Sequence, residues 1–261
     1  MTRTAIIMAG GRGERMARSG VRDPKPLVTV AGVTLLEWNL RLLVRSGVDR
    51  VLVSVAAGDR EVRDVVAARL RAIGEQDGVA VDELVEERPL GNIGPVGLLA
   101  GSVDRVLVVY ADNLTGLDLQ ALDDDHLAGD ADLTLAAHHE PFVMPFGELS
   151  TAADDPRRLL AYTEKPTYRP LVSSGVMVLG RRAVDRAVVE GPIGISQLAQ
   201  ALVDEGGAVR LWIHDAPWVD VNDRPAIERA EQLVARHPEL FPPSGRDVGL
   251  APSGAPRAVR S

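Results

Sequence analysis

The sequence predicts one α/β domain, a three-layer α/β/α arrangement around a mainly parallel mixed sheet. Short apolar runs alternate with segments of helical periodicity along most of the chain, a pattern typical of parallel strands joined by crossover helices. The 261 residues suffice for one sizeable core, and 46% of them are hydrophobic. No internal repeat competes with this interpretation.

The first half of the chain supplies the strands expected at the centre of the sheet. Residues 5–9 form a short apolar run of a length suited to a strand buried on both faces. Further strands are expected at 51–55, 79–85 and 105–110. Apolar residues at helical spacing predict helices at 34–45, which Gly47 ends, and at 61–72, with a shorter helix at 96–100.

The second half continues the alternation. We expect strands at 132–137, 158–163, 172–179 and 209–213, and helices at 195–203 and 226–236. Residues 118–125 are expected to begin a helix whose acidic run, 123–125, lies on the surface. The ordered domain is expected to span 1–240, with a flexible tail at 241–261 that is rich in Pro, Gly, Ser and Ala.

Composition narrows the class of function. The chain has no cysteine, which excludes disulfides, thiolate metal sites and cysteine nucleophiles. Its net charge of −8 argues against a nucleic-acid or anionic-membrane partner, since both require a broad basic face. No apolar run reaches the length of a membrane span, and residues 1–3 lead directly into a strand. We therefore expect a cytoplasmic protein with small anionic substrates.

The segment after the first strand has the character of a polyphosphate site. Three glycines, Gly10, Gly11 and Gly13, permit close approach of backbone N–H groups to a ligand. Several cations follow within a dozen or so residues, at Arg12, Arg15, Arg18, Arg22 and Lys25. The string is neither a Walker A loop nor a dinucleotide fingerprint, whose third glycine would replace Met16.

Lysine usage points to two positions. Of the 29 basic residues only Lys25 and Lys165 are lysines, and each precedes a proline. A compact ammonium differs from a planar guanidinium as a phosphate contact. We interpret both lysines as functional.

The string Gly-Gly-Arg-Gly-Glu-Arg-Met at 10–16, followed by Pro-Lys-Pro-Leu at 24–27, resembles the signature of the sugar-1-phosphate nucleotidylyltransferases (nucleotide-sugar pyrophosphorylases, of the mannose- or heptose-1-phosphate guanylyltransferase kind). Glu14 stands where that family commonly has Thr. The resemblance implies the family's Rossmann-like nucleotidyltransferase fold, with a nucleotide-binding part at about 1–130 and a sugar-phosphate-binding part at 131–240. It further implies catalytic roles for Arg15 and Lys25, and nucleotide binding by Ala9, Gly10, Gly11 and Gly13.

A second nucleotide contact is expected at 86–94. The segment Pro-Leu-Gly-Asn-Ile-Gly is similar to the family's Pro-Leu-Gly-Thr-Ala-Gly, which lies against the base. This similarity implies nucleotide binding by Glu86 and Gly91. A Glu86 carboxylate at the base could only accept hydrogen bonds, which favours the N1–H and amino group of guanine over a pyrimidine acceptor edge.

Two aspartates are candidates for a metal site. Asp112 follows the strand at 105–110, and the carboxyl ends of strands are where ligands gather in open α/β sheets. Asp220 lies in Trp-Val-Asp-Val, which resembles the family's Trp-x-Asp-Val-Gly-Thr-Pro, with Asn222 and Asp223 in place of Gly-Thr. The resemblance implies that Asp112 and Asp220 bind Mg²⁺.

The acceptor side is expected in the second half. The pair at 146–147 resembles the family's aromatic-Gly step, and Glu-Lys-Pro at 164–166 resembles its sugar-phosphate signature. The strand at 172–179 resembles the family's Asn-x-Gly strand. These similarities imply substrate binding by Gly147, Glu164, Lys165 and Gly175. The adjacent His138 and His139 point to opposite faces of a strand and are interpreted as structural or rim residues.

The resemblance covers residues 4–237, nearly the whole domain, and implies Mg²⁺-dependent transfer of a nucleotidyl group from a nucleoside triphosphate to a sugar-1-phosphate. Two alternatives remain open. One is a cytidylyltransferase acting on a polyol or cyclitol phosphate; the other is a non-catalytic regulatory subunit that binds nucleotide-sugars. The sequence does not name the sugar, and it leaves the oligomeric state open, a homo-oligomer included.

Overall fold

The computed structural model describes residues 2–10 and 24–242. Eight of the residues discussed above therefore lie outside the described residues: Gly11, Arg12, Gly13, Glu14, Arg15, Met16, Arg18 and Arg22. Most of the segment expected to form a tail lies outside them as well.

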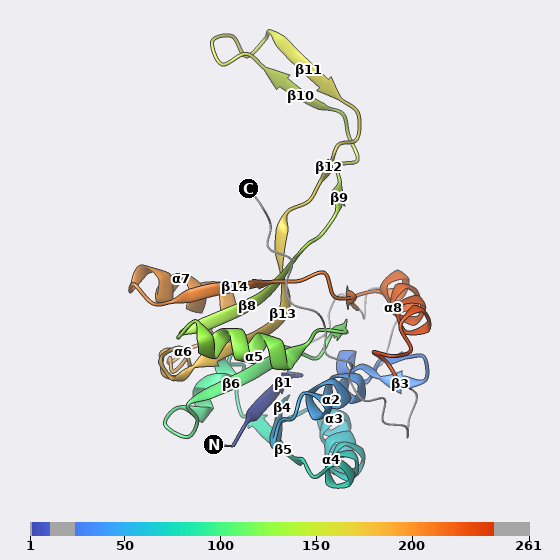
Figure 1. The fold of residues 1–261 in the computed structure, drawn as a ribbon, viewed down its shortest axis with the longest axis vertical. Helices are drawn as coiled ribbons and strands as arrows, with labels where there is room; N and C mark the ends of the chain where they lie inside the picture. The colour runs from blue at the N-terminus through green and yellow to red at the C-terminus, as the bar shows by residue number, and fades with distance from the viewer. Residues whose placement is uncertain (1, 11–23, 243–261) are drawn as a thin grey trace.

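A seven-stranded sheet forms the centre of the molecule (Figure 1). The strand β1 lies between β6 and β4 and is parallel to both; β4–β5 and β8–β14 are also parallel pairs. Only β13 runs antiparallel to its neighbours β6 and β8 among these strands. The expected mainly parallel mixed sheet is thus confirmed. In spatial order the strands are β14 (Val209–Ile213), β8 (Leu133–His139), β13 (Leu171–Gly180), β6 (Arg105–Tyr110), β1 (Thr4–Met8), β4 (Arg50–Ala56) and β5 (Ala80–Glu86).

Helices cover both faces of this sheet because its strands are apolar on both sides. Ile7 packs into the core of one face and Ile6 into that of the other, each with 0% exposure; burying such a side chain stabilises the fold by roughly 1.5–3 kcal/mol. The Ile7 face is covered by α2 (Leu35–Arg45), by the continuous segment α3 (Arg60–Val65), η2 (Val66–Leu70) and α4 (Arg71–Asp77), and by α5 (Leu119–Ala128). The Ile6 face is covered by η3 (Gly94–Leu99), α6 (Arg181–Arg186) and α7 (Ile195–Asp204).

A third, smaller core holds the elements beside the site. Trp38 of α2 packs edge-on against Phe241, with 5.7 Å between ring centroids, and α8 (Arg224–Arg236) contributes Ala230. Asp223 caps α8 by accepting a hydrogen bond of 2.8 Å from the Ala226 N–H. This core joins the short pair β2 (Thr29–Val30) and β3 (Val33–Thr34) with the pair β7 (Asn113–Thr115) and β15 (Trp218–Asp220). Just before β2, η1 (Lys25–Leu27) packs its Leu27 into the core of the Ile7 face.

Two expectations need correction. The helix expected at 61–72 extends over 60–77 and contains a π-helical turn at Val66–Leu70. The placement of Asp123 on the surface is wrong. Asp123 is buried and forms ion pairs with Arg3 (2.9 Å) and Arg105 (2.8 Å), which fasten α5 to the sheet. The acidic run at 123–125 was expected to be solvated, yet its first residue forms buried ion pairs that hold α5 on the sheet.

The chain between β8 and β13 leaves the body as a two-stranded arm, residues 142–168 (Figure 1). Its base pairs β9 (Phe142–Val143) with β12 (Thr167–Tyr168), and its outer part pairs β10 (Glu148–Thr151) with β11 (Leu159–Thr163). All the side chains of these four strands are exposed. In the part of the chain that the structure describes, no helix has the length and apolar character to cross a membrane.

Candidate functional site

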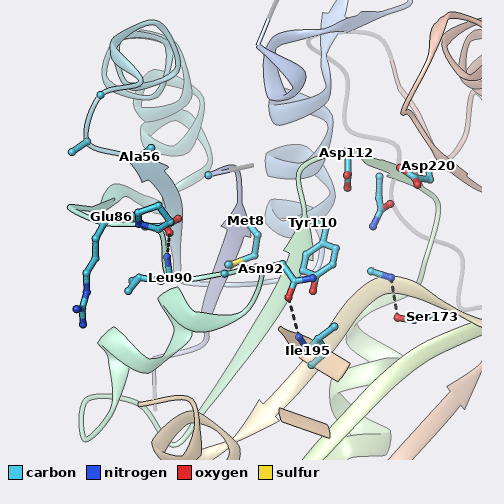
Figure 2. Close-up of a pocket in the computed structure, with 18 of the residues that line it drawn as sticks. Met8, Ala56, Glu86, Leu90, Asn92, Tyr110, Asp112, Ser173, Ile195 and Asp220 are labelled. Carbon is cyan, nitrogen blue, oxygen red and sulfur yellow. Dashed lines mark hydrogen bonds between the residues drawn. The ribbon is translucent and has the colours of Figure 1, made fainter. Parts of the chain in front are cut away.

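A cavity of about 790 Å³ opens at the carboxyl ends of the parallel strands (Figure 2). Met8 and Gly10 come from the end of β1, Ala56 from β4, Glu86 from β5 and Asp112 from the residues after β6. Parallel strands direct their carboxyl ends to one edge of a sheet, so segments far apart in sequence meet here. The volume is in the range of small-molecule sites.

Glu86 closes one wall of this cavity. Its carboxylate is buried; it accepts hydrogen bonds from the Ser54 hydroxyl and, at 3.3 Å, from the Leu90 N–H. The carboxylate lies directly against Gly10, where a Cβ would approach Glu86 Oε1 to 2.3 Å. A side chain at position 10 would therefore displace the Glu86 carboxylate from this position. Ala9 is buried behind it, with its N–H bonded to the Ser54 carbonyl at 3.0 Å.

The next segment of the wall is held by Asn92. Its side-chain oxygen accepts a hydrogen bond of 2.9 Å from the Ile195 N–H, the first of α7 (Figure 2). Gly194, at the N-cap of α7, has no side chain to do this. Gly91, beside it, lines the cavity. The Asn that departs from the family pattern at this position thus ties the nucleotide-side loop to α7.

At the other side of the cavity one lysine and two aspartates meet. Lys25 Nζ lies 2.6 Å from Asp112 Oδ2 and 4.0 Å from Asp220 Oδ1. Asn222 accepts from Lys25 and donates to Asp220. Register explains the meeting of the aspartates, because β15 pairs with β7 so that Asp220 lies opposite Asn113. The structure thus brings together three of the residues that the sequence singled out, and Asn222 joins them.

The chemistry of this cluster fits a hard divalent cation. Asp112 and Asp220 are partly exposed, at 28% and 38% of their side chains, and both line the cavity. Among the described residues there is no group of three or more metal-binding side chains. Mg²⁺ requires fewer, since it retains waters and binds substrate phosphates beside one or two carboxylates. The Lys25 ammonium offsets the repulsion between the two carboxylates, so a positive charge is already required here.

Tyr110 is a cavity residue that sequence reasoning missed. Its hydroxyl is buried without a hydrogen-bond partner among the described residues. Burial, with a smaller contribution from Asp112, raises the pKa of this phenol above its usual value, so it stays a neutral donor. An aromatic residue at the end of an apolar strand, two positions before Asp112, was the available signal.

Below the cavity runs a directed hydrogen-bond chain. The Ala216 N–H donates to His214 Nδ1 at 3.2 Å, so neutral His214 donates from Nε2 to the Ser174 hydroxyl at 2.7 Å. Ser174 then donates to His138 Nδ1 at 2.9 Å, and His138 Nε2 to Glu140 at 3.2 Å. Burial, and secondly the neighbouring His138, lowers the pKa of His214 to about 4. The interpretation of His138 as structural agrees with this network.

The network supports the cavity through Trp218. The indole ring packs on His138, with 4.4 Å between centroids, and its N–H donates to the Ser174 carbonyl at 2.8 Å. Asn113 donates to the same carbonyl at 2.8 Å. Gly175 follows at φ +68°, and a Cβ there would meet the Asn113 amide at 2.2 Å. Of the four expected acceptor-side residues, Gly175 is the one that lines the cavity.

The other three expected acceptor-side residues lie on the arm. Gly147 packs against the Tyr162 hydroxyl, where a Cβ would approach to 2.3 Å, and Tyr162 donates to Glu164 at 3.1 Å. Lys165 follows Glu164. The structure thus brings Gly147 and Glu164 to Tyr162, but none of the three expected residues is in the described lining of the cavity.

Comparison with known proteins agrees with this architecture. A family model described as "Nucleotidyl transferase" matches residues 4–237. Mannose-1-phosphate guanylyltransferase from Mycobacterium tuberculosis is 27% identical over 98% of this chain and 68% of its own length. A relative from Sulfolobus acidocaldarius is 28% identical over 91% of this chain and 65% of its own length. The chain thus spans about two thirds of the length of these relatives.

A third relative is nearer in size. D-glycero-alpha-D-manno-heptose 1-phosphate guanylyltransferase from Aneurinibacillus thermoaerophilus is 26% identical over 69% of this chain and 75% of its own length. Among solved structures, HddC from Yersinia pseudotuberculosis superposes with a TM-score of 0.66 at 21% identity. That superposition covers 88% of this chain and 99% of HddC, and it shows a shared fold.

Proposed function

Because the chain belongs to the nucleotidyl transferase family, we propose that it transfers a nucleotidyl group from a nucleoside triphosphate to a sugar-1-phosphate. The observation that carries the proposal is the meeting of Lys25, Asp112 and Asp220 beside the cavity at the strand ends. A module that only binds a nucleotide-sugar has no need of a paired-carboxylate metal site. The names of the relatives described above support the same reaction.

The reaction needs no covalent enzyme intermediate. A phosphate oxygen of the sugar-1-phosphate attacks the α-phosphorus, and the new O–P bond forms while the bond to the β-phosphate oxygen breaks. The electron pair of that bond leaves with pyrophosphate. The nucleophile is already an anion, so no proton has to be removed, and catalysis consists of positioning and of charge stabilisation.

The roles follow from charge. Asp112 and Asp220 would hold Mg²⁺, which when bound neutralises charge on the α-phosphate region. Lys25 would then turn its ammonium from Asp112 to the triphosphate and the departing pyrophosphate. We propose that Arg15 and the backbone N–H groups of Gly10, Gly11 and Gly13 share this task.

For the nucleotide we propose guanosine triphosphate. Glu86 lines the cavity and can only accept hydrogen bonds, as guanine N1–H and N2–H require. Ser54 and Leu90 each donate a hydrogen bond to the Glu86 carboxylate. Its remaining lone pairs would accept hydrogen bonds from the base. The relatives named guanylyltransferases support this choice, and their mannose and heptose phosphates are the first acceptors to try.

The test is pyrophosphate release with Mg²⁺, for each common nucleoside triphosphate against a panel of sugar-1-phosphates. We expect turnover with GTP and one hexose or heptose phosphate, which Asp112→Asn abolishes. Asp124→Asn, an exposed carboxylate on α5, is the matched control and retains full activity.

Two results would replace the proposal. Turnover with CTP and a polyol or cyclitol phosphate would assign a cytidylyltransferase. No turnover with any pair, together with nucleotide-sugar binding in calorimetry, would assign a regulatory subunit.

A further inference from the structure

The arm exposes an apolar surface that the described part of its own chain does not cover. Seven of its large apolar side chains are more than half exposed. The highest values are 72% for Phe146, 64% for Leu160 and 62% for Tyr162. Contiguous apolar surface of this kind on a soluble domain marks an interaction site.

These side chains are not scattered around the ribbon. Leu149 lies directly opposite Tyr162 in the β10–β11 ladder, and Leu160 is two residues from Tyr162 on the same strand. Leu149 and Tyr162 therefore point to one face of the arm. Leu160 lies at a β-bulge between Ala161 and Leu159, where the strict alternation of side chains is interrupted. An isolated two-stranded ribbon is only marginally stable in water, so an uncovered apolar face indicates that something packs against it.

The same region carries chemistry as well as apolar surface. Glu164 accepts a hydrogen bond from the Tyr162 hydroxyl, and Gly147 packs against the same hydroxyl. Lys165 has a φ of +45°, in the left-handed region that non-glycine residues rarely adopt. Such strained conformations cluster at functional sites. The arm thus presents an acid and one of the two lysines of the chain in a fixed arrangement.

The nucleotide side of the site and these acceptor residues are separated within one chain. Asp112 and Gly175 line the cavity and Lys25 is paired with Asp112. Glu164 and Lys165 lie between β11 and β12, in the arm that projects beyond the body (Figure 1). A sugar phosphate bound by Lys165 has to reach the α-phosphorus at the cavity. Glu164 and Lys165 are therefore useful only beside a cavity of this type.

We propose that the arm of one copy docks on a second copy of this chain and places Glu164 and Lys165 at the cavity of that copy. Each active site is then built from two chains. A second copy is the partner that offers the required cavity, and a two-fold axis completes both sites at once. The proposal rests on the proposed function, and it assigns acceptor binding to residues acting across a dimer.

The edge strand β14 supplies a further surface for the second copy. Leu211 and Ile213 lie on one face of β14 and are 52% and 57% exposed. They pair with Leu135 and Ala137 of β8, the strand that leads into the arm. Because β8 leads into the arm, these exposed side chains offer a second apolar surface for a dimer to bury.

Subunit complementation tests the proposal. Asp112→Asn, with a disabled cavity, and Lys165→Ala, with a disabled arm, are co-expressed with different tags, and the mixed dimers are purified. In a mixed dimer the intact cavity of the Lys165→Ala chain receives the intact arm of the Asp112→Asn chain. We expect about half the wild-type rate from this one restored site per dimer, measured at a low sugar-phosphate concentration at which neither variant alone gives detectable turnover.

If the arm folds onto its own cavity instead, no site in the mixed dimer is intact and activity stays absent. If the mixed dimers show no turnover while the wild type is active, docking of the arm on a second copy is ruled out and the proposed function still holds. If the wild type releases no pyrophosphate with any substrate pair, the proposed function itself is rejected.

Sedimentation velocity supplies a readout that does not depend on activity. We expect the wild type to be a dimer and Leu160→Asp, at an apolar side chain of the arm that is 64% exposed, to be a monomer. Leu127→Asp, at a residue of α5 that is 52% exposed, is the matched control and stays dimeric. A monomeric wild type, or a dimer that Leu160→Asp leaves intact, would contradict the proposal.

Discussion

The body and the arm carry the two lysines of this chain in opposite physical settings. Lys25 is 15% exposed and held by Asp112 and Asn222, within a core that buries the strands around it. Lys165 extends from a ribbon whose strands are exposed along their whole length. The body preorganises its charges with its own packing, whereas the arm carries its charges on a ribbon that lacks such packing. This difference predicts different failures on mutation.

The largest effect is expected from replacing each lysine by methionine. Lys25→Met should lower kcat roughly 100-fold to 1,000-fold, since it removes a charge that stabilises the leaving pyrophosphate. Lys165→Met should instead raise the KM for the sugar phosphate and leave nucleotide binding and stability unchanged. Steady-state kinetics with each substrate varied, together with nucleotide titration, separates the two.

Lys25→Arg and Lys165→Arg are the conservative controls for these variants. Partial recovery in both would show that charge matters more than shape. Equal losses of nucleotide affinity in both methionine variants would contradict the different roles expected for Lys25 in the body and Lys165 on the arm.

Buried and exposed carboxylates give the next contrast. Asp123→Asn should lower the free energy of unfolding by about 3 kcal/mol, because it breaks a buried pair and leaves the Arg3 and Arg105 cations without their counterion. Asp154→Asn, which removes an exposed pair with Arg158 on the arm, should have no measurable effect. Urea unfolding measures both. A stable Asp123→Asn variant would mean that the ion pairs do not fasten α5.

The pH dependence of stability tests the network below the cavity. Folding lowers the pKa of His214 from 6.5 to about 4, so between these values the unfolded chain binds a proton that the folded chain does not. Stability is therefore full above about pH 6.5 and falls as the pH drops toward 4, by on the order of 3 kcal/mol at most. Unfolding free energies across pH 4–8 should lose part of this slope in His214→Gln. His139→Gln, at an exposed histidine, should keep the slope.

How well the sequence predicted the molecule follows the same division. Strand and helix positions in the body agreed within a few residues at almost every element, because burial on both faces of β1 and β4 leaves a continuous apolar run. The place of Asp112 at the cavity followed from the rule that strand ends share an edge, whereas the contacts of Lys25 with Asp112 and Asp220 come from the structure. Local pattern was sufficient where the core dictates position.

The features that pattern reasoning missed depend on long-range partners. Asp123 looks solvated in sequence, and only the approach of Arg3 and Arg105 makes its burial favourable. Asn92 and Asn222 looked like losses from a family motif, yet one caps α7 and the other joins Lys25 to Asp220. The arm contains expected strand residues, but its projection from the body has no signature in hydrophobic periodicity.

The smallest effect is expected at Tyr110. Its buried hydroxyl has no described hydrogen-bond partner in the body, just as the apolar side chains of the arm have no described packing partner. Removing a buried hydroxyl that has no described protein partner relieves a desolvation penalty, so Tyr110→Phe should raise the free energy of unfolding by about 1 kcal/mol. If the hydroxyl donates to a substrate, the same variant should also bind that substrate several-fold more weakly. Thermal unfolding with and without nucleotide measures both terms, with Tyr168→Phe on the arm as the control. A variant that loses stability without ligand would show that the hydroxyl is satisfied within the protein, and Tyr110 would then be a structural residue of the strand end.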